Sequence, residues 1–213
     1  MSLQIDEEIQ KKLNNLTFND IILKIKEDAL NNNVPIIQDE GLAFLLSIIR
    51  LTKPLRILEI GTAVGYSASM MVLNSNAFVD TIERNEEMEN KARYNLALLK
   101  LEDRVNLIFK DALDAFDIVK DNKYDLIFID AAKAQYTNFF NLYSPLLNDD
   151  GVIVTDNMLF HGVKIEDAKT RALRGLIRKL NNYQEFLINN KDFDTTIFNI
   201  GDGMAITTKK MWR

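Results

Sequence analysis

Apolar residues in the first quarter of the chain recur at the spacing of one helix face. Four of them fall on the same side of a predicted helix: Leu42, Leu45, Leu46 and Ile49. Asp39 and Glu40 precede this face, where acidic side chains stabilise a helix N-terminus. Two earlier helices are predicted over residues 2–14 and 17–31, because runs of asparagine interrupt the pattern after each. Residues 1–33 are therefore expected to be an N-terminal helical extension.

From residue 55 onward, short apolar runs alternate with helical stretches. Five runs predict buried strands, at residues 56–60, 78–83, 105–109, 126–130 and 152–155. This alternation is typical of a parallel sheet with helices on both faces. Two further β-rich runs, 195–200 and 204–208, flank Gly201–Gly203 and predict an antiparallel hairpin at the sheet edge.

The pattern as a whole predicts an α/β, Rossmann-like fold. Its sheet has seven strands, mostly parallel, and ends in the C-terminal hairpin. Residues 1–213 show no low-complexity stretch or repeat, so we expect a single domain.

Composition and charge restrict the possible partners and cellular location of this domain. The net charge of −5 argues against a protein that coats nucleic acid or membranes through bulk charge, although a local basic patch remains compatible with it. There is no cysteine, which excludes disulfides and cysteine nucleophiles and fits a reducing compartment. The sequence has neither a signal-peptide core nor an apolar run of about 20 residues, so we expect a cytoplasmic protein without a membrane partner.

A glycine loop follows the first predicted strand and opens a helix. Gly61 and Gly65 have the spacing Gly-x-x-x-Gly, which differs from the patterns of pyrophosphate and phosphate loops. Glu59 lies at the strand end, where a carboxylate would repel an anion and suit a cationic ligand. Glu83 ends the second strand, where a carboxylate can accept hydrogen bonds from ribose hydroxyls. We interpret the loop as a cofactor site; taken alone, the glycine pair is also compatible with a packing turn.

The third predicted strand is followed by Asp111 and Ala112. Ligands of open α/β sheets bind at the carboxyl ends of the strands, so this position faces the same site. An acidic side chain can accept a hydrogen bond from the adenine amine, and alanine leaves room for the ring. Asp111 is equally compatible with an ordinary helix N-cap.

Oxygen-bearing side chains follow the next two strands. The strand 126–130 ends at Asp130, and the strand 152–155 is followed by Asp156 and Asn157. Neighbouring parallel strands lie about 4.8 Å apart, so these side chains can meet. Two carboxylates and an amide oxygen suit Mg²⁺, Mn²⁺ or Ca²⁺. The two carboxylates alone could form an acid–base pair, but that role leaves Asn157 unexplained.

Together these motifs resemble the metal-dependent class I O-methyltransferase family, which includes catechol and caffeoyl-CoA O-methyltransferases. The resemblance runs from about residue 34 to residue 209 and is strongest to the bacterial branch that methylates 5-hydroxyuridine in tRNA. It rests on five segments: Glu59–Ser67, Ile82–Arg84, Asp111–Ala112, Ile129–Lys133 and Asp156–Asn157.

The resemblance implies roles for individual residues. S-adenosylmethionine is expected to contact Glu59, Gly61, Ser67, Glu83, Asp111, Ala112 and Asp130, and also Ile37, which falls near a region that closes over the cofactor in relatives. The metal ligands are expected to be Asp130, Asp156 and Asn157. Lys133 is implied as the general base, with a surface lysine as the alternative. His161, the lone histidine, is interpreted as a loop residue.

A basic stripe follows the metal-site loop. Arg171, Arg174 and Arg178 share one face of a predicted helix and could bind tRNA phosphates, although they are equally compatible with a solvated surface. A 5-hydroxyuridine presents its hydroxyl beside a carbonyl, a vicinal oxygen pair like that of a catechol.

The leading hypothesis is therefore O-methylation of the tRNA wobble uridine. Methylation of small catechol-like phenols is the second hypothesis, and a noncatalytic S-adenosylmethionine-binding module is the third. The resemblance also implies a homodimer.

Overall fold

The computed structural model describes residues 19–159 and 168–210. The predicted helix over residues 2–14 and His161 lie outside the described residues. The described α-helices are α2 (Asp20–Asn31), α3 (Asp39–Thr52), α4 (Tyr66–Leu73), α5 (Glu86–Leu99), α6 (Phe116–Val119), α7 (Tyr136–Tyr143) and α8 (Arg171–Ile188). Two short 3₁₀ helices, η1 (Lys133–Gln135) and η2 (Ser144–Leu146), flank α7.

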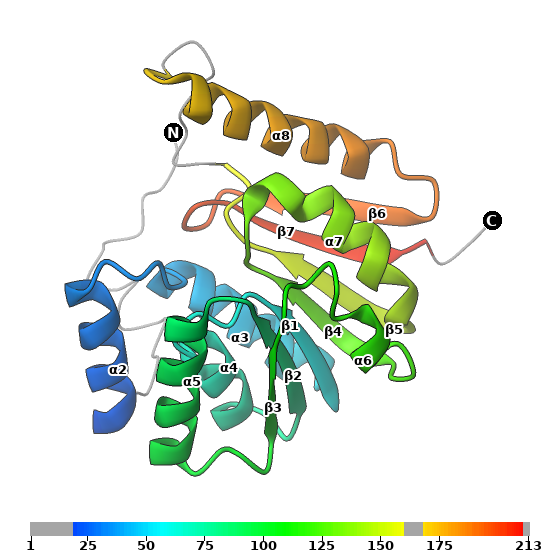
Figure 1. Cartoon of the computed structure of the whole chain (residues 1–213). Coiled ribbons are helices and arrows are strands. Elements are labelled where there is room, and N and C mark those ends of the chain that lie inside the picture. Colours follow the sequence, from blue (N-terminus) through cyan, green and yellow to red (C-terminus); the bar gives the residue numbers. More distant parts are fainter. Residues whose placement is uncertain (1–18, 160–167, 211–213) are drawn as a thin grey trace, which may run out of the picture.

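Seven strands form one sheet in the order β3-β2-β1-β4-β5-β7-β6 (Figure 1). They are β1 (Arg56–Ile60), β2 (Phe78–Glu83), β3 (Val105–Phe109), β4 (Tyr124–Ile129), β5 (Leu147–Thr155), β6 (Phe193–Phe198) and β7 (Met204–Lys209). The first five run parallel, and β7 and β6 form the antiparallel hairpin at the edge. The predicted Rossmann-like, mostly parallel sheet is confirmed. Several boundaries differ from the prediction: β5 begins five residues earlier, β4 and β6 each begin and end earlier, and β7 ends one residue later. Because β4 ends at Ile129, Asp130 lies just beyond the strand.

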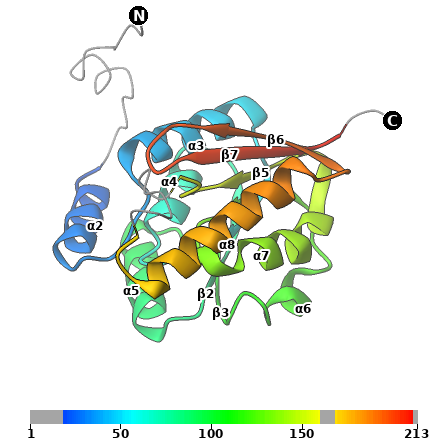
Figure 2. The ribbon, with the colours of Figure 1, turned by 90° about the horizontal axis from the view of Figure 1, so that it is seen from above.

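Alternate residues of each central strand face opposite sides of the sheet, so the core has two halves. Ile57 and Phe128 pack with α2, α3 and α4 on one side, whereas Leu58 and Ile129 pack with α7 and α8 on the other. Figures 1 and 2 show these two helical layers with the sheet between them. Because both faces are covered, the edge where the strands end is left for function.

None of the helices in the described residues combines the length and the apolar character needed to cross a membrane.

Gly61 is required by close packing of the backbone. Its φ of +103° lies in the region that favours glycine, and a β-carbon there would lie 2.1 Å from the carbonyl oxygen of Asp130. We expect Gly61→Ala to lower the free energy of unfolding by about 3 kcal/mol or more, because the substitution forces β1 and β4 apart at their ends.

Gly175→Ala is the matched control for this prediction. Gly175 lies inside α8, and a β-carbon there would meet nothing within 4 Å. Alanine should raise the stability by about 0.5–1 kcal/mol. Denaturant unfolding of both variants checks the pair, and equal effects of the two substitutions would contradict the packing argument.

Candidate active site at the carboxyl ends of the strands

Strands β4 and β5 bring two carboxylates to the same edge. Ile129 pairs with Thr155 at the ends of the two strands, so Asp130 and Asp156 are the next residues along each. The backbone N–H of Asp130 donates to the Ile60 carbonyl at 3.0 Å, and that of Asp156 donates to the Ile129 carbonyl at 3.1 Å. Sheet-like bonding thus continues one residue past the strands and fixes both acidic residues.

Asn157 completes the group predicted from the sequence. Its φ of +61° is left-handed, a conformation that asparagine tolerates better than most residues. In this conformation its side-chain amide donates to Asp130 Oδ1 at 3.0 Å, and its backbone N–H donates to Asp156 Oδ1 at 2.6 Å. The hydroxyl of the buried Tyr136 donates to the Asp156 carbonyl and so helps to fix this segment.

The negative charges of Asp130 and Asp156 are only partly balanced by nearby positive charge. Burial raises the pKa of both Asp130 and Asp156, and the negative charge of Asp130 raises that of Asp156 further. The positive charge of Lys133 acts in the opposite direction on both carboxyl groups. A pair of buried carboxylates that disfavour each other's ionisation is an environment in which a cation would be stabilised.

Asp202 also belongs to this environment, although its place there was not predicted from the sequence. It lies in the turn between β6 and β7, and its negative charge raises the pKa of Asp130 and Asp156. The missed signal was the Gly-Asp-Gly turn itself: an antiparallel strand placed beside β5 necessarily starts at the edge where β5 ends.

The donor set fits a hard divalent cation. In residues 19–159 and 168–210, no three His, Cys, Asp or Glu side chains come together in a way that could hold a metal ion. The candidate set instead contains two carboxylates and the amide of Asn157, all of which offer oxygen, the ligand atom that Mg²⁺ and Ca²⁺ prefer.

The glycine loop packs against the same strand ends. Gly61 and Thr62 donate their backbone N–H groups to the Ile82 carbonyl, and Gly65 starts α4 in a left-handed conformation with φ of +78°. The structure therefore gives Gly61 a packing role that does not depend on a ligand. Contact with a cofactor stays a prediction for this residue.

Glu59 is buried beneath the loop rather than exposed at the strand end. The hydroxyls of Ser67 and Thr81 donate to its two carboxylate oxygens, each at 2.5 Å. Burial raises the pKa of Glu59 to about 8, although both hydrogen bonds act to lower it. Near neutral pH this pKa favours the protonated form of Glu59 in the absence of a ligand. A cationic ligand would shift the balance back toward the carboxylate.

Glu83 ties the loop to the end of β2. Its Oε2 accepts a hydrogen bond from the Ala63 N–H at 2.9 Å, and its Oε1 accepts from the N–H groups of Arg84 and Asn85. A carboxylate has about four lone-pair positions, so these bonds still leave capacity for a ribose hydroxyl.

Asp111 and Ala112 lie at the end of β3, as predicted. Asp111 is not the N-cap of the following helix, because that position belongs to Ala115. Its carboxylate instead closes a turn by accepting from the Leu113 N–H and pairs with Arg84, and both interactions lower its pKa, the turn bond more strongly. The carbonyl of Ala112 accepts from the buried hydroxyl of Tyr143.

Ile37 is buried in the core before α3 and would contact a β-carbon placed at Gly41. Its expected contact with the cofactor also stays a prediction.

Comparison with known proteins identifies the family. Residues 6–210 match the family model described as O-methyltransferase. The chain is 40% identical to a Staphylococcus aureus protein of known structure, described as a "putative caffeoyl-CoA O-methyltransferase", with a TM-score of 0.90 over 96% of this chain and 99% of that one.

The chain belongs to the O-methyltransferase family. It is therefore an enzyme, an S-adenosylmethionine-dependent O-methyltransferase.

More distant relatives agree with this assignment. The flavonoid 3',5'-methyltransferase of Vitis vinifera is 28% identical over 82% of this chain and 77% of its own length. The caffeoyl-CoA O-methyltransferase of Populus kitakamiensis is 25% identical over 82% of this chain and 77% of its own length.

The arginine stripe of this O-methyltransferase lies where the sequence placed it. Arg171, Arg174 and Arg178 are exposed in the first half of α8, which Thr170 caps by accepting from the Leu173 N–H. Arg174 also donates to the Ala168 carbonyl at 2.9 Å.

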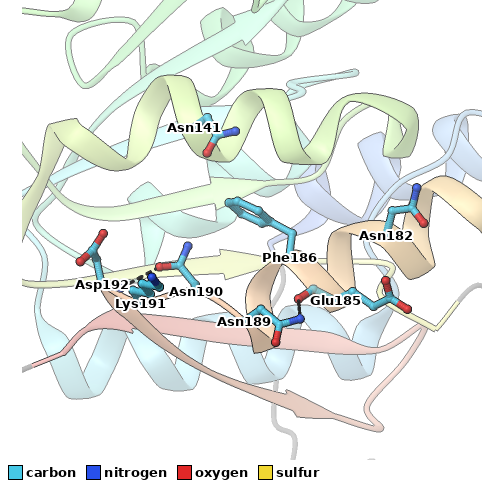
Figure 3. A pocket seen from close by; sticks show the side chains of 8 residues that line it. All are labelled: Asn141, Asn182, Glu185, Phe186, Asn189, Asn190, Lys191 and Asp192. Atoms are coloured by element: carbon cyan, nitrogen blue, oxygen red, sulfur yellow. Dashed lines mark hydrogen bonds between the residues drawn. The ribbon is translucent and has the colours of Figure 1, made fainter.

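A cavity of about 580 Å³ lies away from the strand ends (Figure 3). Asn141 of α7, three residues near the end of α8 and the loop before β6 line it, with Phe186 in its wall. β6 starts opposite Lys209, at the far end of the hairpin from Asp202. This cavity is therefore separate from the carboxylate group of the O-methyltransferase.

The raised pKa of Glu59 predicts a pH-dependent stability difference. The folded state holds a proton on Glu59 up to about pH 8, whereas the unfolded state releases it near the ordinary value of 4.5. Between these values folding takes up a proton, so this residue's contribution to stability falls as pH rises and is constant outside that window. A glutamine side chain cannot ionise, so the Glu59→Gln variant should gain stability relative to the parent from pH 5 to pH 8.

Thermal unfolding of both proteins at pH 5, 6.5 and 8 measures this difference. The other buried acids are common to both proteins, so the difference between the two melting temperatures reports the ionisation of Glu59. A difference in melting temperature that does not change with pH would contradict the assigned protonation.

Proposed function

We propose that this enzyme methylates a hydroxyl that has a second oxygen beside it, in the cytoplasm, with a divalent metal at the strand ends. The observation that carries the proposal is the convergence of Asp130, Asp156 and Asn157 at the ends of β4 and β5, next to the glycine loop. A noncatalytic binding module has no need for such a group, and membership of an enzyme family also argues against it.

Asp130, Asp156 and Asn157 would hold the metal, with Mg²⁺ as the first choice and Mn²⁺ or Ca²⁺ as alternatives. A divalent cation in this position supplies a Lewis acid that stabilises the ionised acceptor hydroxyl and favours a chelating pair of oxygens. The uncompensated negative charge of the two buried carboxylates supports this role.

In its neutral form, Lys133 would accept the proton of the acceptor hydroxyl. It lies in η1, three residues after Asp130, close enough for its protonated form to lower the pKa of both Asp130 and Asp156. A base at this place is close to the site where the hydroxyl must ionise, which is the first requirement for proton transfer.

S-adenosylmethionine would lie along the loop and the ends of β1 to β4. The residues proposed to contact it are Ile37, Glu59, Gly61, Ser67, Glu83, Asp111, Ala112 and Asp130. Their places around neighbouring strand ends agree with the general position of ligands in open α/β sheets. The roles of these side chains are to bind and orient, so most of the rate acceleration is expected from positioning.

For the acceptor, we propose 5-hydroxyuridine at the wobble position of tRNA. The exposed stripe of Arg171, Arg174 and Arg178 supports contact with phosphates. Small catechol-like phenols are the second candidate, favoured by the similarity to a flavonoid and to a caffeoyl-CoA methyltransferase. A homodimer remains part of the proposal on the basis of family resemblance alone.

The metal role predicts a selective effect of Asp156→Ala. Turnover should fall by about a thousandfold or more, because the variant loses a charged ligand, whereas S-adenosylhomocysteine binding measured by calorimetry should change little. Asp150→Ala removes an exposed acid from the same strand and should retain activity. Full turnover by Asp156→Ala, or activity that survives rigorous chelation, would refute the metal role.

The acceptor is tested with labelled methyl donor, Mg²⁺ and either hypomodified tRNA or a panel of catechols. Label in tRNA supports the leading proposal, and label in catechols alone replaces it with the second candidate.

Reversal of charge on α8 gives an independent test of tRNA binding. Arg171→Glu with Arg174→Glu should weaken tRNA binding about tenfold or more and reduce the slope of log affinity against log salt by about 2. The control pair Arg50→Glu and Lys53→Glu changes exposed residues at the opposite end of the strands, in the last turn and at the C-cap of α3. Equal losses in both pairs would argue for bulk charge instead of a defined footprint.

A further inference from the structure

The turn between β6 and β7 is brought to the carboxylate group by the antiparallel pairing of β7. Thr155, the last residue of β5, pairs with Ala205 near the start of β7. The residues just before β7, Gly201 to Gly203, must therefore lie at the edge where the parallel strands end. An added parallel strand would have placed its preceding loop at the opposite edge.

Two backbone hydrogen bonds fasten this turn to the loop that follows β5. The N–H of Met158 donates to the Gly203 carbonyl at 2.9 Å, and the N–H of Leu159 donates to the Asp202 carbonyl at 2.8 Å. Gly203 has a φ of +90°, and a β-carbon there would lie 2.5 Å from Leu159 Cγ. Only glycine permits this approach, and it fixes the backbone of Asp202 relative to Asp156.

The other side of the turn meets the start of α3. A β-carbon at Gly201 would lie 3.4 Å from Gln38 Oε1 and 3.5 Å from the Gly41 nitrogen. The turn is thus packed between two segments, and the side chain of Asp202 is half-buried. A partly buried charge acts more strongly on its surroundings than a fully solvated one.

Asp202 lies at the same edge as both proposed acidic ligands, because its turn is hydrogen-bonded to Met158 and Leu159, which directly follow Asp156 and Asn157. When all are ionised, these three carboxylates and Lys133 leave two negative charges uncompensated. Asp202 does not join the other two closely enough to form a three-acid metal site within the described residues. Its influence on a bound cation would therefore act through space or through intervening water.

We propose that Asp202 is a positioning residue that strengthens divalent-cation binding at Asp130, Asp156 and Asn157 through its charge, without being a ligand. The inference rests on the proposed metal role of that group. It gives the Gly-Asp-Gly turn a function, whereas a turn needed for the hairpin alone would require the glycines but not the acid between them.

Manganese binding by the full-length protein tests the proposal without reference to activity. Free Mn²⁺ is measured by electron paramagnetic resonance during titration of the parent and of Asp202→Asn, which keeps the shape and removes the charge. We expect the variant to bind Mn²⁺ about tenfold more weakly, the lower end of the effect of residues that support metal ligands from outside the coordination sphere. Asp202→Glu should recover much of the affinity.

Asp194→Asn is the matched control. Asp194 is an exposed acid in β6 of the same hairpin, 3.6 Å from the Lys210 ammonium, and its removal should leave Mn²⁺ affinity unchanged. Thermal unfolding in the absence of metal should show Asp202→Asn to be at least as stable as the parent, because the variant relieves repulsion among the carboxylates.

A trivalent probe separates a charge effect from a structural one. Coulomb energy scales with the charge of the ion, so a tenfold loss for Mn²⁺ predicts a loss of about thirtyfold for Tb³⁺, followed by its luminescence. Equal losses for the two ions would indicate distortion of the site and overturn the proposal.

Unchanged Mn²⁺ affinity in Asp202→Asn, with strong binding by the parent, would overturn the role of Asp202 and leave the proposed metal site standing. If the parent protein binds neither ion, the metal role is wrong and the inference falls with it.

Discussion

Parallel pairing of β1, β4 and β5 continues one residue beyond each strand, and this backbone arrangement determines where the acids lie. Asp130 is held by the Ile60 carbonyl, and Asp156 by the carbonyl just before Asp130. Gly61 allows this because its missing β-carbon leaves room for the Asp130 carbonyl. The glycine loop and the carboxylate group therefore share one backbone junction, so a change that displaces either one displaces the other.

This junction concentrates acidic groups that the fold itself does not neutralise. Burial disfavours ionisation of Asp130, Asp156 and Glu59, and the nearby Lys133 offsets only part of the charge of the first two. Such an arrangement costs stability in the free protein and is characteristic of places that bind charged ligands. Glu59 differs from the other two, because burial raises its pKa to about 8 and keeps it neutral, while two hydroxyl donors stand ready to stabilise the carboxylate when a cation binds.

The fold and the convergence of Asp130, Asp156 and Asn157 could be predicted because both follow from local patterns. Apolar strands that end abruptly in Asp130 or in Asp156–Asn157 place those residues at one edge of any parallel sheet. The protonation of Glu59 could not be predicted, because it depends on complete burial beside Ser67 and Thr81. Asp111 was ambiguous for a related reason: its turn bond and its ion pair come from partners that periodicity does not identify.

Asp202 shows where topology adds to sequence pattern. The hairpin was predicted from the sequence, but the position of its turn depends on which strand the hairpin joins. Because β7 pairs with β5 rather than with β3, the outer parallel strand on the other side of the sheet, the turn lies beside Asp156. A parallel sheet supplies loops to this edge only from strand ends. The antiparallel hairpin adds a loop that precedes a strand, and two backbone hydrogen bonds hold this loop against the segment that follows β5. The hairpin therefore adds an acidic residue, Asp202, to the edge that carries Asp130 and Asp156. The five parallel strands could not provide this residue by themselves.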